Sequence, residues 1–317
     1  MIFISDLREG DYVDGIYLCK TKMEGKTKSG RTYYGLTLQD RTGTVDAKVW
    51  DLSSGIDHFE ALNYIHVTGE ATLYQNAVQL NIRRIYKARE GEYDPADYMP
   101  SSPYNEEEMF KKITAYAMSI KNQYLGQLVR GFFVDDSAFI KAFRKHSAAK
   151  SVHHSFMNGL LQHTLRVTEL CDFYCLHYPV LQRDLLISGA LLHDIGKIRE
   201  IGAMPENEYT DAGQLLGHIA MGYEMVAARV RQIPGFPEKL EHEIEHLILS
   251  HHGELEYGSP KKPSLIEAVA LHFADNTDAR LETITEIFEN AQPGTGWLGY
   301  QKFVEANVRR STDLSKE

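Results

Sequence analysis

Residues 1–90 alternate between apolar and polar positions, which is the pattern of half-buried β-strands. The alternation is clearest in the segments VDAKV (residues 45–49) and VQLNI (residues 78–82). Further strands are predicted near residues 12–21, 32–39 and 63–73, with one short helix over residues 55–61 between the third and fourth strands. Five strands with a helix in that position predict a small β-barrel of the OB type.

The pattern changes after residue 105. Apolar positions recur with helical spacing from residue 106 to about residue 290, so this region is predicted to be an all-α bundle. Residues 91–105 hold three prolines and two serines and are predicted to be a linker. The chain is therefore expected to be a multidomain protein of α and β structure, in which residues 291–317 form a C-terminal tail of unassigned structure.

Charge and composition narrow the function classes. The 317 residues carry a formal charge of -10, whereas nucleic-acid-binding proteins are usually basic. Residues 1–90 are balanced, with 12 basic and 12 acidic residues, so the acidic excess lies in the helical region. The longest apolar run, near residues 185–192, is far shorter than the roughly 18 residues of a membrane-spanning helix. Three cysteines do not make a disulfide framework, and we expect buried thiols and a cytoplasmic protein.

Histidine and aspartate residues recur at the ends or along the inward faces of the predicted helices. The spacing places His163 beside Leu160 and Val167, and it places Asp275 on a helix whose apolar face includes Ile266 and Val269. The full set is His163 in NGLLQHTLRV, His193 and Asp194 in GALLHDIGK, His218 in LLGHIAMG, His251 and His252 in ILSHHGE, and Asp275 in LHFADNTDAR.

Each of these histidines, taken alone, has a structural alternative as a hydrogen-bonded core residue. The two aspartates change the balance, because a buried carboxylate is costly unless it is paired or bound to a metal. Several imidazoles and two carboxylates on inward helical faces predict a site for two metal ions. Because imidazole is the majority ligand, Mn, Fe, Co, Ni or Zn is favoured over Ca or Mg.

The ordered series H…HD…H…HH…D, with the segment HDIGK, resembles the HD-domain metal-dependent phosphohydrolases over residues 146–280. The resemblance implies that His163, His193, Asp194 and Asp275 hold one ion. A second ion would share Asp194 and add His218 and either His251 or His252. Lys197 matches a position that contacts phosphate in related enzymes, and its structural alternative is a solvated lysine after a helix end.

The combination of an OB-type barrel, a linker and an HD domain that begins with AAKSVHHSFMNGLLQHT resembles the YhaM-type 3′–5′ exoribonucleases over residues 1–290. His153 and His154 lie where that family also has a histidine pair, so they either line the site or form a polar segment before the helix. The resemblance implies hydrolysis of single-stranded RNA from its 3′ end to 5′-mononucleotides, with two divalent ions, Mn²⁺ preferred. Single-stranded DNA is an alternative substrate.

The barrel offers an independent reason to expect nucleic acid. The predicted first loop, residues 20–32, is rich in lysine and arginine, and OB domains commonly bind single strands through this loop and the second and third strands. Alternation points Tyr33, Lys48 and Trp50 outward, which fits a platform on which bases stack. The alternative is a solvated loop with two aromatic residues covered by a neighbouring domain. The candidate nucleic-acid-binding residues are Lys26, Lys28, Arg31, Tyr33, Lys48 and Trp50.

The predicted chemistry is hydrolysis of a phosphodiester by a hydroxide that two metal ions generate from water near neutral pH. Asp194 and Lys197 are the candidate catalytic residues, with Lys197 assisting charge neutralisation at the phosphate. Two alternatives are an HD-type phosphohydrolase of small nucleotides and a non-catalytic single-strand-binding protein. The exposed faces of the acidic helical region leave a homo-oligomer open, and no membrane partner is expected.

Overall fold

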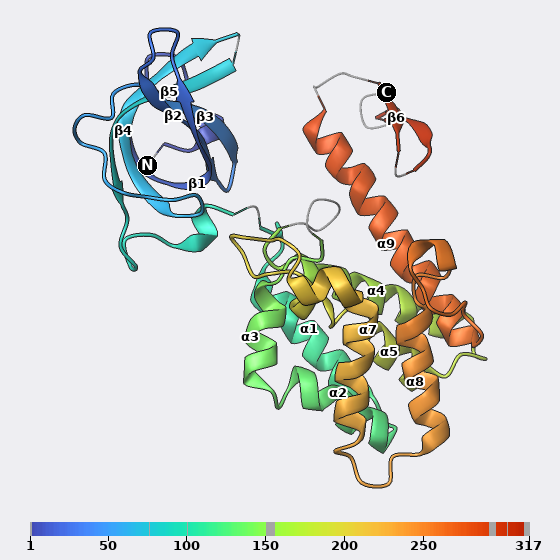
Figure 1. Cartoon of the computed structure of the whole chain (residues 1–317). Helices are drawn as coiled ribbons and strands as arrows, with labels where there is room; N and C mark the ends of the chain where they lie inside the picture. The colour runs from blue at the N-terminus through green and yellow to red at the C-terminus, as the bar shows by residue number, and fades with distance from the viewer. Residues whose placement is uncertain are drawn as a thin grey trace. The chain divides into compact units, whose positions relative to one another are not determined.

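A computed structural model describes residues 2–75, 77–99, 101–149, 156–291, 296–302 and 304–313. The chain forms two compact units, Met1–Ser101 and Ser102–Glu317. The first unit is a closed five-stranded barrel with strand order β1-β2-β3-β5-β4, which confirms the predicted OB-type barrel (Figure 1). Its strands are β1 (Tyr12–Lys26), β2 (Thr32–Asp40), β3 (Gly43–Val49), β4 (Tyr64–Tyr74) and β5 (Ala77–Lys87).

The barrel core follows the alternation of the sequence. Val45, Ala47 and Val49 of β3 are buried, as are Leu80 and Ile82 of β5. The barrel closes through antiparallel pairing of β1 with β4 and parallel pairing of β3 with β5. The predicted helix over residues 55–61 is wrong, because this segment is irregular and makes only an isolated bridge from Ile56 to Ile85.

The predicted first loop is also mostly wrong. Residues 20–26 continue β1, and the register Lys26↔Thr32 leaves only residues 27–31 for the turn. The turn is closed by a hydrogen bond from the Thr27 amide to the Arg31 carbonyl at 2.8 Å. Lys28 and Arg31 therefore lie in a tight turn, whereas Lys26 ends the strand.

Residues after β5 pack on the barrel instead of leaving it at once. The ring of Tyr93 stacks on that of Tyr64 at a centroid distance of 3.9 Å. Tyr98 is buried, and its carbonyl accepts a hydrogen bond from Gln39 Nε2 at 3.0 Å. The boundary between the two units falls after Ser101, inside the segment predicted to be a linker.

The second unit is a bundle of helices around one apolar core. Asn105, Asn122 and Asp136 begin the first three helices by accepting hydrogen bonds from backbone amides, as N-cap residues do. The helices are α1 (Glu106–Ser119), α2 (Gln123–Phe133), α3 (Ser137–Lys145), α4 (Gly159–His177), α5 (Arg183–Leu192), α6 (Lys197–Glu200), α7 (Asp211–Val230), α8 (Glu238–Ser250) and α9 (Ile266–Asn290).

The structure differs from the sequence-based prediction at helix α9 and adds a hairpin in the tail that follows it. Ile266 and Val269, predicted for its apolar face, are 48% and 40% exposed, and the buried side instead carries Leu271 and Asp278. Beyond α9, the tail forms a hairpin of β6 (Trp297–Gln301) and β7 (Ala306–Arg309). No helix in the described part of the chain is long and apolar enough to cross a membrane.

Candidate metal centre and nucleic-acid interface

Two groups of side chains meet inside the helical unit. One joins His163 of α4 and His193, which ends α5, with Asp275 of α9. His163 Nε2 lies 3.3 Å from His193 Nε2 and 3.2 Å from Asp275 Oδ1. Two ligand atoms at about 2.1 Å from one ion and at right angles lie about 3 Å apart, so this spacing fits one bound cation.

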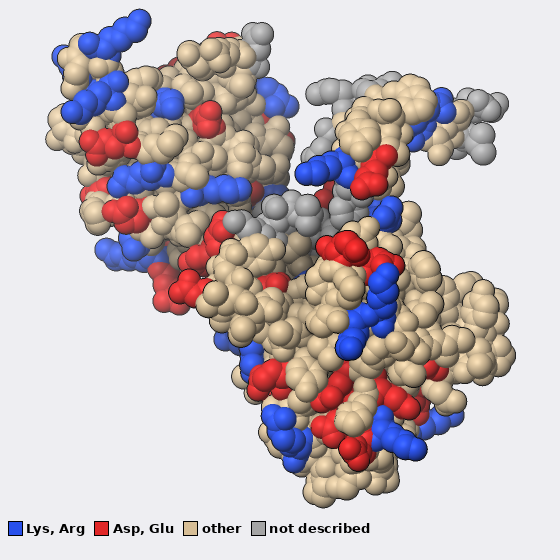
Figure 2. All heavy atoms as spheres, turned by 45° about the vertical axis from the view of Figure 1, so that its right-hand side comes forward, with Lys and Arg blue, Asp and Glu red and all other residues tan. Residues whose placement is uncertain are grey.

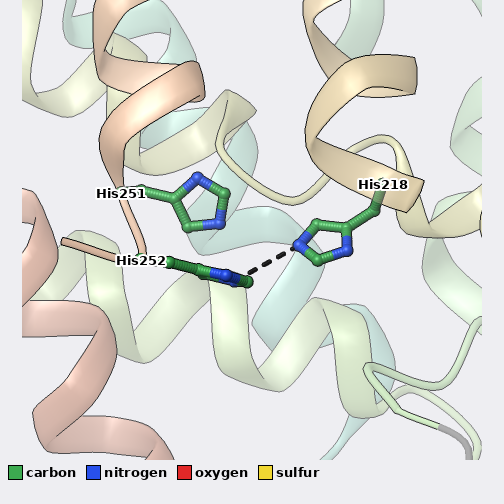
Figure 3. A group of neighbouring side chains, drawn as sticks. All are labelled: His218, His251 and His252. Atoms are coloured by element: carbon green, nitrogen blue, oxygen red, sulfur yellow. Dashed lines mark hydrogen bonds between the residues drawn. The ribbon is translucent and has the colours of Figure 1, made fainter. Parts of the chain in front are cut away.

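The second group comes from the kinked helix α7 and the end of α8. His218 Nε2 lies 3.3 Å from His252 Nε2, and His251 lies beside both rings (Figure 3). The kink is at Gly217, whose φ of +74° few other residues adopt. It turns the following helical segment so that its first residue, His218, faces His251 and His252, which directly follow α8.

Asp194 lies between the two groups. Its Oδ2 atom is 3.3 Å from Nε2 of both His163 and His193. Its Oδ1 atom is 3.5 Å from His218 Nε2 and 3.7 Å from His251 Nε2. The carboxylate is 2% exposed, and its shortest contact is with Lys197, whose Nζ atom lies 2.7 Å from Oδ2.

All five histidines are oriented in the same way. Each Nδ1 atom contacts an oxygen that can only accept a hydrogen bond, so each Nδ1 donates and each Nε2 faces the centre. The five acceptors are Asp278 Oδ2 for His163 (2.7 Å), Ala190 O for His193 (2.8 Å), Glu200 Oε1 for His218 (3.0 Å), Ile248 O for His251 (2.7 Å) and Tyr257 O for His252 (2.8 Å).

This orientation directs the five Nε2 atoms and the oxygens of Asp194 and Asp275 at one another in a buried space. The Lys197 ammonium supplies one positive charge to this cluster, and divalent cations among the inward Nε2 and carboxylate atoms would stabilise it further. His251 Nε2, fully buried, has no hydrogen-bond partner among the residues that the structure describes. The donor set therefore fits divalent metal ions, and its imidazole majority is typical of transition metals.

The pKa shifts follow from burial and from these neighbours. Burial lowers the pKa of His252 to about 3, with help from the His251 and His218 rings, so it is neutral at pH 7. Burial alone would lower the pKa of His163, but hydrogen bonds to Asp194, Asp275 and Asp278 outweigh burial and hold it well above the usual value. Burial would raise the pKa of Asp194, but the Lys197 charge and the neighbouring His193 and His163 rings together outweigh burial and hold it well below the usual range.

Lys197 is not the solvated lysine of the structural alternative. It begins α6, is 9% exposed, and its Nζ atom lies 2.7 Å from Asp194 Oδ2. The turn that places it passes close to α7: a Cβ added at Gly196 would meet the His218 carbonyl oxygen at 2.0 Å. The glycine of the HDIGK segment thus lets the lysine and the aspartate approach the His218 helix.

Two carboxylates of the centre were missed by the sequence analysis. Glu200 accepts from both the backbone amide (2.9 Å) and Nδ1 (3.0 Å) of His218, so it caps the second half of α7 and fixes the ring. Asp278 fixes His163 and is itself 3.6 Å from Arg166 Nη1. The sequence could have indicated Asp278, because it follows Asp275 by three residues on one helix. No sequence pattern indicated Glu200.

The outward residues of the barrel lie together. The rings of Tyr33 and Trp50 are 4.8 Å apart at 34°, and Lys48 Nζ is 5.7 Å from the Tyr33 ring centre. Trp50 is 50% exposed, and its Nε1 donates to Asn81 Oδ1 at 3.1 Å. We call Tyr33, Lys48 and Trp50 the aromatic platform. Charged side chains of both signs are interspersed over the visible face of the barrel (Figure 2).

Comparison with known proteins decides the family. The HD domain family matches residues 160–280. The 3′-5′ exoribonuclease YhaM of Geobacillus sp. (strain WCH70) is 34% identical over 287 residues, which cover 90% of this chain and 87% of that protein. The chain belongs to the YhaM exoribonuclease family. Its metal-centre residues His163, Asp194 and Asp275 lie within the HD match.

Solved structures add little to the YhaM family assignment. The second OB-fold domain of replication protein A from Methanococcus maripaludis is 16% identical and covers 29% of this chain and 98% of that chain, with a TM-score of 0.22. The OB domain of Ta0387 from Thermoplasma acidophilum is 12% identical and covers 29% of this chain and 91% of that chain, with a TM-score of 0.23. TM-scores this low carry no argument. His153 and His154 of the YhaM-like histidine pair lie outside the described residues.

Proposed function

We propose that this chain is a metal-dependent 3′–5′ exoribonuclease that hydrolyses single-stranded RNA to 5′-mononucleotides. Membership of the YhaM family supports the reaction. The single observation that carries the proposal is the position of the Asp194 carboxylate, with one oxygen toward His163 and His193 and the other toward His218 and His251. A carboxylate shared in this way is the arrangement that joins two metal ions in phosphodiester-cleaving sites.

The proposed holders of the ions follow the two groups. His163, His193, Asp194 and Asp275 would hold one ion, and Asp194 with His218, His251 and His252 would hold the other. Mn²⁺ is the proposed ion because the family resemblance implies it, and Fe, Co, Ni and Zn are alternatives that suit a donor set rich in imidazole. When bound, such ions supply a water of lowered pKa and neutralise charge on the phosphate oxygens.

The chain's own residues prepare this chemistry. Glu200 and Asp278 hold the His218 and His163 rings with Nε2 inward, so these rings need no reorientation when metal ions bind. Lys197 keeps Asp194 ionised through their 2.7 Å contact. Because Lys197 also lines the cavity beside the centre, we propose that it contacts the phosphate as negative charge develops there.

We propose a division of labour along the chain. Residues 1–90 bind the strand, residues 91–105 link the two parts, and residues 106–290 carry the hydrolysis. Bases would stack on Tyr33 and Trp50, and each stack contributes about 1–3 kcal/mol to binding. Lys48, Lys26 at the end of β1 and the turn cations Lys28 and Arg31 would contact the nucleic-acid backbone. The cytoplasm is the proposed compartment, since Cys19 and Cys171 are buried free thiols.

The test is digestion of a 5′-labelled single-stranded RNA with added Mn²⁺, beside an Asp194→Ala variant. We expect labelled products that shorten from the 3′ end with the natural chain and an intact RNA with the variant. A parallel single-stranded DNA of the same sequence measures the sugar preference. If the metal-loaded wild-type protein leaves the RNA intact, the proposal is contradicted and a phosphohydrolase of small nucleotides is favoured. Assays with a panel of nucleotides would then identify its substrate.

A further inference from the structure

A cavity of about 700 Å³ opens beside the metal centre inside the helical unit. Its outer part is lined by Arg280 of α9 and by Lys302, Val304 and Glu305, which lie in the turn between β6 and β7. The C-terminal hairpin therefore forms one wall of the cavity. The residues that the cavity shares with the metal centre are Lys197, His252 and Asp275.

The hairpin is fastened to α9 at the end opposite its turn. Arg310, which follows β7, donates a hydrogen bond to the Phe288 carbonyl oxygen, and its guanidinium lies 5.3 Å from the Phe288 ring centre. The backbone amide of Arg310 also donates to Gly296 O at 2.9 Å, which closes the base of the hairpin. The base of the hairpin lies at the C-terminal end of α9 (Figure 1). Its turn lies beside Ala279 and Arg280, which are earlier in the same helix and line the same cavity.

The two cations of this wall are available to a ligand. Arg280 Nε donates to Asn276 Oδ1 at 2.8 Å, which fixes the guanidinium beside the cavity. Within the described ranges, neither Arg280 nor Lys302 has a carboxylate at ion-pair distance, and both side chains are exposed. Among the described residues that line the outer wall, Glu305 is the only carboxylate, so the two cations outnumber it.

The spacing along α9 suits a nucleic-acid strand. Arg280 follows Asp275 by five residues, which is a rise of about 7.5 Å along the helix axis. A rise of this size is about one nucleotide step, and both side chains line the same cavity although they are about 140° apart around the helix. A cation at that distance meets the phosphate next to the one being cleaved, and a guanidinium binds phosphate through two parallel hydrogen bonds.

We propose that the hairpin wall is a subsite for the strand, in which Arg280 and Lys302 bind the backbone phosphate on the 5′ side of the scissile one. The inference rests on the proposed function, because it assumes that a strand is cleaved at the metal centre. It gives the C-terminal hairpin a role in substrate binding. It also predicts that one extra phosphate in the substrate is enough to engage the wall.

The test uses two short substrates, the dinucleotide ApA and the trinucleotide ApApA. Only ApApA has a phosphate on the 5′ side of the scissile one. For the natural chain with Mn²⁺ we expect kcat/KM to be roughly tenfold higher for ApApA, mostly through a lower KM. The double variant Arg280→Gln/Lys302→Gln should cleave ApA at the natural rate and lose this gain.

Two further variants control for charge and for the hairpin itself. Arg309→Gln removes an exposed cation of the same hairpin that does not line the cavity, so it should keep the tenfold gain. Arg280→Lys keeps a charge and should retain part of the gain. If the double variant keeps the full gain, or loses ApA cleavage as well, the subsite is refuted. If the natural chain cleaves neither these substrates nor a longer RNA, it is the proposed function that fails.

Discussion

The metal centre of the helical unit and the aromatic platform of the barrel are built in opposite ways. At the centre, Asp194 and His251 are almost wholly buried, and their partners come from α4, α7 and α9 and from the residues that directly follow α5 and α8. On the platform, Trp50 is half exposed and its neighbours lie on adjacent strands. A change at the centre should therefore alter folding, metal binding and catalysis together, whereas a change on the platform should alter strand binding alone.

The largest expected effect is that of Asp194→Ala. The variant removes the oxygens between the two groups of ligands, and we expect hydrolysis to fall by at least about a thousandfold for RNA and for a small phosphodiester alike. It also leaves Lys197 buried without its partner, which should lower the free energy of unfolding by about 3–5 kcal/mol. Urea denaturation and metal analysis measure the two effects.

The double variant Asp194→Ala/Lys197→Met separates stability from chemistry. Removing the unpaired charge should restore most of the free energy of unfolding but none of the metal content or activity. Recovery of activity in the double variant would show that Asp194 acts only through Lys197. It would contradict the claim that a change at the centre alters folding, metal binding and catalysis together.

The second-largest effect is expected at Glu200, which holds His218 but is not one of the proposed metal ligands. Glu200→Gln keeps the size of the side chain but weakens the hold on His218 Nδ1, and outer partners of this kind typically contribute 10–100-fold to metal affinity. We expect a loss in that range when Mn²⁺ binding is titrated by calorimetry. Glu224→Gln, an exposed glutamate paired with Arg199, is the matched control and should bind Mn²⁺ normally.

The contrast also explains what could be predicted from the sequence. Alternation predicted the inward residues of β3 and the outward Trp50, because a strand's burial is set by its own period. The histidines and aspartates were found by their order in the chain. Glu200 was not, since its role depends on a contact with a residue 18 positions away across a glycine kink. The buried face of α9 was mispredicted for a similar reason. This face packs on α4 and α5 and includes the polar Asp275 and Asp278, so the apolar residues of the helix alone did not locate it.

A smaller effect is expected on the platform. Trp50→Ala should weaken binding of a single-stranded oligonucleotide roughly tenfold, because one stacking surface is lost. Cleavage of a small phosphodiester and the free energy of unfolding should stay near their natural values. Tyr12→Ala, which removes another exposed tyrosine of the barrel, is the control. An equal loss of small-substrate cleavage in Trp50→Ala would contradict the separation of the two regions.

The smallest effect tests whether the platform has a supporting contact of its own. Asn81 accepts a hydrogen bond from Trp50 Nε1 and donates through Nδ2 to Thr72 Oγ1 at 3.2 Å, so it fixes the indole on the barrel surface. Asn81→Ala should weaken oligonucleotide binding about threefold, which is the size of one exposed hydrogen bond. In a chain that already carries Trp50→Ala, the same change should have no effect, because the side chain that Asn81 positions is gone. Fluorescence anisotropy of a labelled RNA with the wild-type protein, the two single variants and the double variant measures this coupling. A threefold loss that persists without Trp50 would mean that Asn81 contacts the strand directly, and the platform would then extend onto β5.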